Sequence, residues 1–202
     1  MTKRIFDIMF SFAMLCLLWP LLIIIALAIK VVSPGAVFYK GQRAGRSGVP
    51  FHILKFRTMV SNAEALGGVS TPEDDPRVTS VGRILRKYKL DELPQLFNVL
   101  KGEMSVVGPR PEVISEVKLY TRVERELLMV RPGMTDWASV RFRNEGEILK
   151  GSPEPHQTYR EKIRPEKMRL GLQYARTHSF LIDMQVLAAT AKALLWARGG
   201  GR

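Results

Sequence analysis

The sequence predicts an α+β fold, a small domain of short strands and several helices that follows an N-terminal re-entrant membrane helix hairpin. Three observations predict it. An uncharged run covers Ile8–Ile29, short strand-like stretches bounded by glycine follow, and stretches with helical apolar spacing fill the second half. We therefore divide the chain into a membrane-inserted segment, residues 1–32, and a membrane-associated domain, residues 33–198, with interfacial amphipathic helices.

The N-terminal run has the length of a membrane helix. No charged residue stands between Asp7 and Lys30. A helix of this length reaches about 33 Å at ~1.5 Å per residue, enough for the hydrocarbon core. The run is too long for the apolar part of a signal peptide, and no small-residue cleavage site follows it. A buried core helix is the less favoured alternative.

Proline and flanking charge indicate how this segment sits in the bilayer. Pro20 follows Trp19 near the middle of the run, and a helix breaks or kinks at an internal proline. Basic residues flank both ends, at Lys3–Arg4 and within residues 30–46. A straight span would place one basic flank on the wrong side of the membrane. We therefore expect a membrane break at Trp19 and Pro20 and a hairpin with both flanks cytoplasmic, in preference to a kinked span.

Composition limits the partners. Lys and Arg number 31 against 19 Asp and Glu, a formal net charge of +12. Such an excess favours anionic partners: nucleic acid, anionic lipid or phosphorylated small molecules. We expect no nucleic acid, because the basic residues lack the aromatic interleaving of a single-strand-binding surface. Cys16 is the single cysteine, so the chain has no disulfide framework and no cysteine metal site.

Several elements are expected after the membrane segment. Two strands are predicted at Val37–Tyr39 and Phe51–Phe56, with a basic, glycine-containing loop at residues 41–48 between them. That loop either cradles a phosphate through backbone N–H groups or is a plain hairpin turn, and the turn is favoured. Further helices are expected at about 111–130, 165–177 and 181–197. The last of these either lies on the membrane surface or packs into the core.

The acidic pair Asp91 and Glu92 is the clearest candidate site. Pro94 is tolerated only in the first turn of a helix, so the pair lies at or just before a helix N-terminus. That position favours a phosphoryl group beside the carboxylates, whereas a solvated helix start is the simpler alternative. Four cations precede the pair: Arg83, Arg86, Lys87 and Lys89.

A second acidic cluster, Glu73–Asp75, lies in a loop beside two prolines. Three neighbouring carboxylates are able to hold a cation. A solvated turn is the more common outcome for such a loop and is favoured here.

Motifs along nearly the whole chain resemble one family. They are Lys3–Asp7, Ser33–Gly35 with Val37–Lys40, Lys55–Met59, Asp75–Thr79, Gly82–Pro111 and Arg131–Thr135. In this order they are similar to the bacterial sugar transferases, and specifically to the small monotopic polyprenyl-phosphate phosphoglycosyl transferases.

The resemblance implies an activity, its partners and a location. Such enzymes transfer a sugar 1-phosphate from a UDP-sugar to polyprenyl phosphate, usually undecaprenyl phosphate, release UMP and so start a glycoconjugate. They act at the cytoplasmic face of the bacterial inner membrane, among membrane lipid. By the same resemblance Asp91 is the nucleophile that forms an aspartyl-phosphosugar intermediate. Mg²⁺ is the implied cofactor, held by Glu92 together with Asp91, and Glu92 is alternatively a proton-handling group.

Four cations within the matching motifs are predicted to contact substrate phosphate. Lysine offers a point charge and arginine a planar, bidentate donor pair. The predicted residues are Lys55, Arg57, Arg86 and Arg110.

Some residues differ from the family pattern, and two alternative functions are also considered. Asp136 and Ser139 stand where relatives commonly have glycine and glutamine, and Trp19-Pro20 stands where relatives often have Ser-Pro. A non-enzymatic basic protein that binds lipid or nucleic acid is one alternative, but it gives Asp91 and Glu92 no role. A glycosyl transferase that moves the sugar alone is the other, and it would release UDP.

Overall fold

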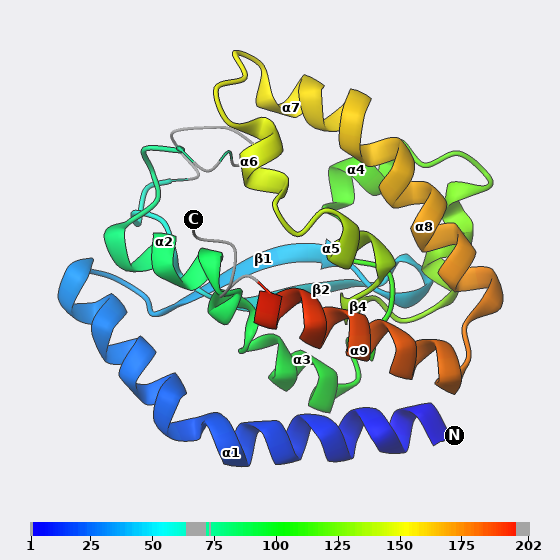
Figure 1. Cartoon of the computed structure of the whole chain (residues 1–202), viewed down its shortest axis with the longest axis horizontal. Helices are drawn as coiled ribbons and strands as arrows, with labels where there is room; N and C mark the ends of the chain where they lie inside the picture. Colours follow the sequence, from blue (N-terminus) through cyan, green and yellow to red (C-terminus); the bar gives the residue numbers. More distant parts are fainter. Residues whose placement is uncertain (1, 64–71, 73, 197–202) are drawn as a thin grey trace.

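The computed structural model of the chain describes residues 2–63, 72 and 74–196. Its N-terminal element is one helix, α1 (Thr2–Val32), which runs along one edge of the molecule (Figure 1). Among the described residues, α1 is the one helix whose length and composition suffice to cross a membrane. Short strands and further helices form the rest, so the predicted mixture of helix and short strand is confirmed.

The strands form two small sheets in the described part of the chain. Strands β1 (Phe38–Ala44) and β2 (Pro50–Phe56) pair antiparallel, whereas β3 (Ser105–Val107) and β4 (Gly133–Thr135) pair parallel. In β2, buried residues alternate with exposed ones near its start, which is the period-2 pattern of a half-buried strand. The main core joins β2 and β3 to the helices. Its buried residues are Phe51, Ile53, Val99, Met104, Val106, Val107, Tyr174 and Val186.

Short helices surround these sheets, and two longer ones end the described chain. The α-helices that follow α1 are α2 (Ser80–Lys87), α3 (Gln95–Lys101), α4 (Ile114–Lys118), α5 (Trp137–Arg141), α6 (Glu145–Leu149), α7 (Pro155–Thr158), α8 (Arg164–Thr177) and α9 (Phe180–Trp196). Within the described residues, 3-10 turns lie at Arg46–Gly48, Leu90–Glu92 and Glu124–Met129, and a π turn lies at Tyr159–Ile163. Helices α8 and α9 confirm the two predicted near the C-terminus.

The single helix predicted at 111–130 is wrong. The structure has α4 there, then a break, then the 3-10 turn Glu124–Met129. The break has a local cause, because the Thr121 hydroxyl accepts from the Glu124 N–H at 3.2 Å and the Glu124 carboxylate accepts from the Thr121 N–H at 2.7 Å. This reciprocal capping box starts a new turn at Thr121.

The loop after β1 is a turn. Strand β1 continues to Ala44, and the Gly45 N–H donates to the Val49 carbonyl at 2.8 Å to close the connection. The favoured prediction, a hairpin turn, is therefore confirmed for residues 45–49, whereas residues 41–44 belong to the strand and not to the loop.

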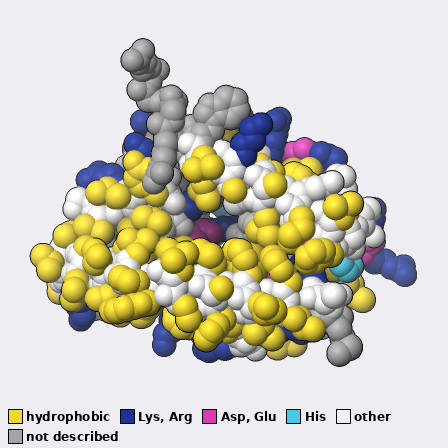
Figure 2. Space-filling view, turned by 60° about the horizontal axis from the view of Figure 1, so that its bottom comes forward, with side chains coloured by type: hydrophobic (Ala, Val, Ile, Leu, Met, Phe, Trp, Pro, Cys, Tyr) yellow, Lys and Arg dark blue, Asp and Glu magenta, His cyan; other side chains and the backbone are white. Residues whose placement is uncertain are grey.

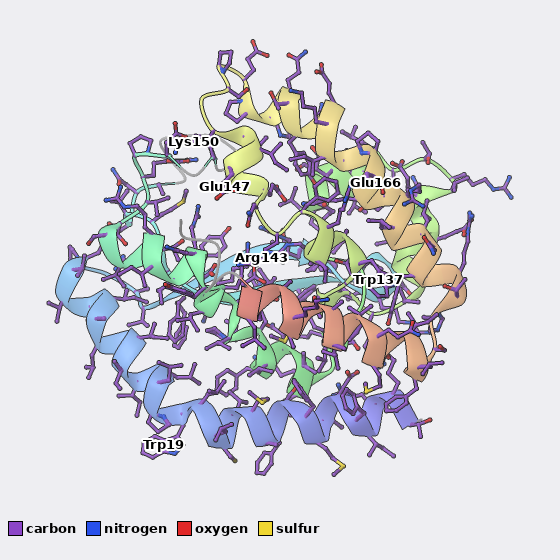
Figure 3. The ribbon with its side chains drawn as sticks, viewed as in Figure 1. Trp19, Trp137, Arg143, Glu147, Lys150 and Glu166 are labelled. Carbon is purple, nitrogen blue, oxygen red and sulfur yellow. The ribbon has the colours of Figure 1, made fainter. Side chains whose placement is uncertain are left out.

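Helix α1 bends near its middle. Pro20 lies inside the helix and Trp19 lies at the corner of the bend (Figure 3). Proline removes one backbone donor but has a φ compatible with a helix, so apolar residues on both sides keep the helical form. The predicted break at Trp19 and Pro20 is thus a bend within one helix, and the hairpin of two segments is not confirmed.

The first arm of α1 is held to the domain by charged side chains. Asp7 is buried and accepts from the Ser105 hydroxyl at 2.9 Å and from the following backbone N–H at 3.0 Å. Lys3 lies 2.6 Å from the buried carboxylate of Asp183 in α9. Arg4 donates to two carbonyls near the end of α3. The Lys3–Asp7 motif therefore joins α1 to β3, α3 and α9.

The second arm of α1 packs on another part of the same domain. Ile25 and Ile29 are buried in a cluster with Phe56 and Leu85, from β2 and α2. Arg57 donates to the carbonyls of the two residues that follow α1, at 2.6 and 2.7 Å. Both ends of α1 are therefore fixed to one domain.

Candidate active site

A short irregular connection presents the acidic pair between α2 and α3. Two residues after α2 ends, Lys89 has a left-handed backbone, φ +56°, and the 3-10 turn Leu90–Glu92 follows. Leu93 and Pro94 keep right-handed helical torsions and lead into α3. A lysine in the left-handed region costs about 1–2 kcal/mol, so neighbouring contacts hold this turn in place.

Two cations clamp Glu92. The Lys55 ammonium lies 3.0 Å from Glu92 Oε1, and the Arg110 guanidinium donates to both carboxylate oxygens, with Nη1 3.1 Å from Oε2. Burial alone raises the pKa of Glu92, but the charges of Arg110 and Lys55 outweigh burial and hold that pKa well below 4.5. Glu92 is therefore an ionised carboxylate whose two oxygens are both occupied.

Backbone packing fixes where Arg110 lies. The chain leaves β3 at Gly108, whose N–H donates to the Thr135 carbonyl at 3.0 Å. A Cβ at Gly108 would lie 2.5 Å from the Arg131 carbonyl oxygen, so only glycine fits this close approach. Arg110 follows two residues later and points back to Glu92.

Asp91 differs sharply from its neighbour. It is 8% exposed, and its Oδ1 has no hydrogen-bond partner among the described residues. Burial raises the pKa of Asp91 above its ordinary 3.8, against the pull of the nearby Lys55, and the charge of Glu92 raises it further. A buried carboxylate with a free oxygen is poised either to attack an electrophile or to bind a cation.

Two further cations act on the pair. Arg86 donates through Nε to the Thr58 hydroxyl at 2.9 Å, and its charge is felt by Asp91. Lys89 lies within electrostatic range of both carboxylates. Lys89 was noted in the sequence but not predicted as a site residue. Its place directly before the acidic turn was the available signal.

One of the predicted phosphate contacts, Arg57, is bound to backbone carbonyls in this structure. The two terminal nitrogens of Arg57 are bound to the backbone carbonyls after α1, and the side chain is buried. The structure therefore gives Arg57 a joining role between β2 and α1. Lys55, Arg86 and Arg110, in contrast, come together around Asp91 and Glu92.

In the second acidic cluster, the described carboxylate of Asp75 is engaged by an arginine. Asp75 is buried and bound to Arg77, with Arg77 Nη2 2.6 Å from Asp75 Oδ2, while Glu73 lies outside the described residues. Among described residues, no group of three or more His, Cys, Asp or Glu side chains is placed to hold a metal ion.

The departures at Asp136 and Ser139 form a helix cap. Asp136 is buried and accepts from the Ser139 N–H at 2.7 Å, which starts α5. Nearby, Arg143 donates to the Ala193 carbonyl of α9 (Figure 3). This segment is thereby tied to the C-terminal helix.

The face of the molecule seen in Figure 2 is strongly apolar. Figure 2 shows hydrophobic side chains covering it, with a narrow opening in which acidic atoms are visible. The exposed large hydrophobic residues of α1 and α9 are Ile5, Ile8, Met9, Phe12, Leu17, Trp19, Ile23, Ile24, Leu27, Val31, Val32, Phe180, Leu181, Leu194 and Leu195.

Comparison with known proteins identifies the family of the chain. The model of the bacterial sugar transferase family matches residues 1–197. The chain is 38% identical to the UDP-glucose:undecaprenyl-phosphate glucose-1-phosphate transferase of Caulobacter vibrioides over 96% of this chain and 69% of that protein. It is 34% identical to the uncharacterized sugar transferase EpsL of Bacillus subtilis, over 98% and 89% of the two chains.

A third relative has a different sugar in its name. The chain is 35% identical to the UDP-N-acetylgalactosamine-undecaprenyl-phosphate N-acetylgalactosaminephosphotransferase of Aeromonas hydrophila, over 98% of this chain and 44% of that protein. The chain therefore belongs to the bacterial sugar transferase family. It is an enzyme, and the names of its relatives agree with the phosphoglycosyl transferase class expected from the sequence.

Proposed function

We propose that this enzyme transfers a sugar 1-phosphate from a UDP-sugar to undecaprenyl phosphate and releases UMP, as the first membrane step of a glycoconjugate pathway. The observation that carries the proposal is Asp91, a buried carboxylate with an unpartnered oxygen, set among the cations that surround Glu92. The names of the relatives support the donor and the acceptor.

The charge of the site suits a diphosphate donor. Lys55, Arg86, Lys89 and Arg110 supply four positive charges, and Asp91 and Glu92 supply two negative charges, so 4 − 2 leaves two positive charges. A diphosphate esterified at both ends carries two negative charges, which this excess neutralises. Because Glu92 forms ion pairs with both Lys55 and Arg110, the two cations are held in place before the donor arrives.

The first step is a displacement at the phosphorus that bears the sugar. An oxygen of Asp91 forms a bond to this phosphorus, and the bond from the phosphorus to the bridging oxygen breaks. UMP leaves with the electron pair of that bond, and the cations around the site neutralise its new charge. The product on the enzyme is a mixed anhydride of Asp91 and the sugar phosphate, which is a better phosphoryl donor than a sugar phosphate ester.

The second step regenerates Asp91. A phosphate oxygen of undecaprenyl phosphate attacks the same phosphorus, the bond to Asp91 breaks, and a polyprenyl diphosphate sugar is formed. The opening in the apolar face supports this route, because the polyprenyl chain is accommodated along that face while its phosphate enters (Figure 2).

The residues present fit Mg²⁺ carried largely by the donor. Mg²⁺ in phosphoryl-transfer sites takes one or two carboxylates and completes its shell with phosphate oxygens and water. Asp91 has a free oxygen for such an ion, whereas both oxygens of Glu92 are occupied by Lys55 and Arg110. The ion would neutralise diphosphate charge when bound. We therefore assign to Glu92 the role of holding Lys55 and Arg110. EDTA is expected to stop UMP release, and added Mg²⁺ is expected to restore it.

Attachment of both ends of α1 to one domain supports the proposed membrane arrangement. A helix fixed at both ends to the same domain enters the bilayer with its exposed apolar side and returns, so both flanks stay on the cytoplasmic face of the bacterial inner membrane. In a Cys16→Ser background, cysteines at Thr2 and at Lys40 are expected to be labelled from the same side of the membrane. Labelling from opposite sides contradicts this arrangement.

Product analysis tests the reaction itself. The full-length enzyme in detergent or nanodiscs is incubated with undecaprenyl phosphate and a panel of UDP-sugars. UMP release is expected with at least one donor, and Asp91→Asn is expected to abolish it. Release of UDP would instead indicate transfer of the sugar alone, and no nucleotide release would favour a binding protein.

A further inference from the structure

Three buried side chains run from the acidic pair into the core. Asp91 lies in the 3-10 turn Leu90–Glu92, and backbone bonds between residues three apart link this turn to α3. Asp91, Gln95 and Val99 are all buried, whereas Phe97 is 41% exposed, so these three side chains lie on the inward side of the segment. Val99 is fully buried in the main core cluster. On this inward side, Gln95 follows the reactive carboxylate and precedes the core residue.

The side chain of Gln95 is buried with its nitrogen unpaired. The residue is 1% exposed, and its Nε2 has no hydrogen-bond partner among the described residues. Asn98, on the same helix and equally buried, is fully used: it accepts from the Leu54 N–H at 2.9 Å and donates to the His52 carbonyl at 2.8 Å. Asn98 therefore carries a structural amide, whereas the described residues leave the amide nitrogen of Gln95 without a partner.

An unpartnered buried amide is costly. Leaving one such donor without a hydrogen bond costs about 1–3 kcal/mol, and an apolar side chain of the same size would avoid that cost. Asp91 Oδ1 is the other unpartnered polar atom in this turn. Four residues of helical chain advance only about 6–8 Å, so one phosphoryl group between the two side chains is able to contact both.

We propose that Gln95 is a further catalytic residue, whose carboxamide N–H donates to a non-bridging oxygen of the phosphoryl group while that group is transferred to and from Asp91. This rests on the proposed function, in which Asp91 is the nucleophile. A phosphoryl group satisfies both atoms at once, because its phosphorus forms a bond to the Asp91 oxygen and one of its own oxygens accepts a hydrogen bond from Gln95. A neutral donor placed there stabilises the more crowded transition state without adding a charge that binds the ground state equally well.

The test compares wild type with Gln95→Met, which keeps the volume and removes the donor. With the UDP-sugar that wild type turns over fastest, and without acceptor, rapid-quench mass spectrometry of the intact protein measures how fast the sugar phosphate forms on Asp91. Gln95→Met is expected to slow this step about a hundredfold, in line with loss of one transition-state donor. The KM for the donor is expected to change less than threefold, and the melting temperature to stay or rise.

Controls separate the outcomes. Asn98→Leu is expected to lower the melting temperature, because that amide has structural partners. Adduct formation by Gln95→Met at the wild-type rate, or a loss that only follows unfolding, overturns the role of Gln95. Should Gln95→Met fail to fold, Gln95→Glu keeps the shape and places a negative charge against the phosphoryl group. Full activity of Gln95→Glu at neutral pH overturns the inference equally.

Failure of the proposed function gives a different pattern. An active Asp91→Asn variant, or a wild type that releases UMP without an adduct on Asp91, refutes the covalent mechanism whatever Gln95 does. A wild type that forms the adduct, with an inactive Asp91→Asn and a fully active Gln95→Met, refutes the role of Gln95 alone.

Discussion

Replacing Glu92 by glutamine directly tests the clamp, the pair of ionic contacts that Glu92 makes with Lys55 and Arg110. The change keeps the shape and removes the charge that faces Lys55 and Arg110. At 3.0 Å and an effective dielectric constant of ~20, the Lys55–Glu92 attraction alone amounts to about 5 kcal/mol before desolvation is subtracted. Removing one partner of a buried pair costs about 3–5 kcal/mol. Because the side chains of Lys55 and Arg110 are 20% and 35% exposed, water screens part of this, and we expect the low end, about 3 kcal/mol.

The assay is a thermal melt combined with UMP release by the full-length enzyme. A loss of about 3 kcal/mol lowers the melting temperature by roughly 6–12 °C for a chain of this size. The rate constant of UMP release is expected to fall about tenfold to a hundredfold, because Lys55 and Arg110 lose the group that orients them. UMP, added as an inhibitor, is expected to bind more tightly, since the site gains one net positive charge.

Glu126→Gln is the matched control. Glu126 also pairs with an arginine, Arg176, at 2.7 Å, but both side chains are about half exposed and lie on the surface. This variant is expected to melt within about 2 °C of wild type and to keep its activity. Unchanged stability and rate in Glu92→Gln would refute the clamp. Rescue of that variant by excess Mg²⁺ would instead make Glu92 a metal ligand.

Three further outcomes follow from the structure. Asp91→Asn is expected to abolish turnover yet raise the melting temperature by about 2–4 °C at neutral pH, because it removes a desolvated charge. Since the pKa of Asp91 is raised in the folded state, its stabilising contribution is full below pH 3.8 and is lost as pH rises, so the stability gain of the variant in melts should grow from pH 4 to pH 7. UMP release by wild type should fall as pH is lowered through the same raised pKa. Arg57→Met is expected to cost about 2 kcal/mol in denaturant unfolding through two lost carbonyl partners, with the KM for the donor nearly unchanged, whereas a large rise in KM at full stability would make Arg57 a phosphate contact. Gly82→Ala is expected to yield little folded protein in expression trials, because a Cβ there would lie 2.0 Å from the Thr58 carbonyl oxygen.

Features with local causes were predictable from the sequence. The apolar run of α1, the bend at Pro20 and the placement of Asp91 and Glu92 just before a helix all depend on neighbouring residues. Periodicity gave α8 and α9 for the same reason. The capping box at Thr121 was also a local signal, and because it was missed, the helix predicted at 111–130 was too long.

Contacts between distant segments were not predictable from local pattern. Lys55 and Arg110 reach Glu92 from 37 and 18 residues away, so their convergence depends on how β2 and β3 pack beside α3. The resemblance to a family brought them to the candidate list, but spacing alone did not. The contacts of Arg57 were equally unpredictable from local pattern. Alternation along a strand would put Arg57 on the same side as Lys55, yet β2 ends at Phe56, and the next side chain turns to α1 instead.

The attachment points of α1 explain why the apolar helix belongs to the site's framework. Its first arm is fixed through Asp7 to the strand β3, from which the chain continues to Arg110. Its second arm is fixed by Arg57, two residues after Lys55. Each end of α1 thus holds one of the two segments that deliver a cation to Glu92. Because each arm of α1 is bound to a segment that carries one of these cations, the position of α1 and the alignment of the charged site are coupled in this fold.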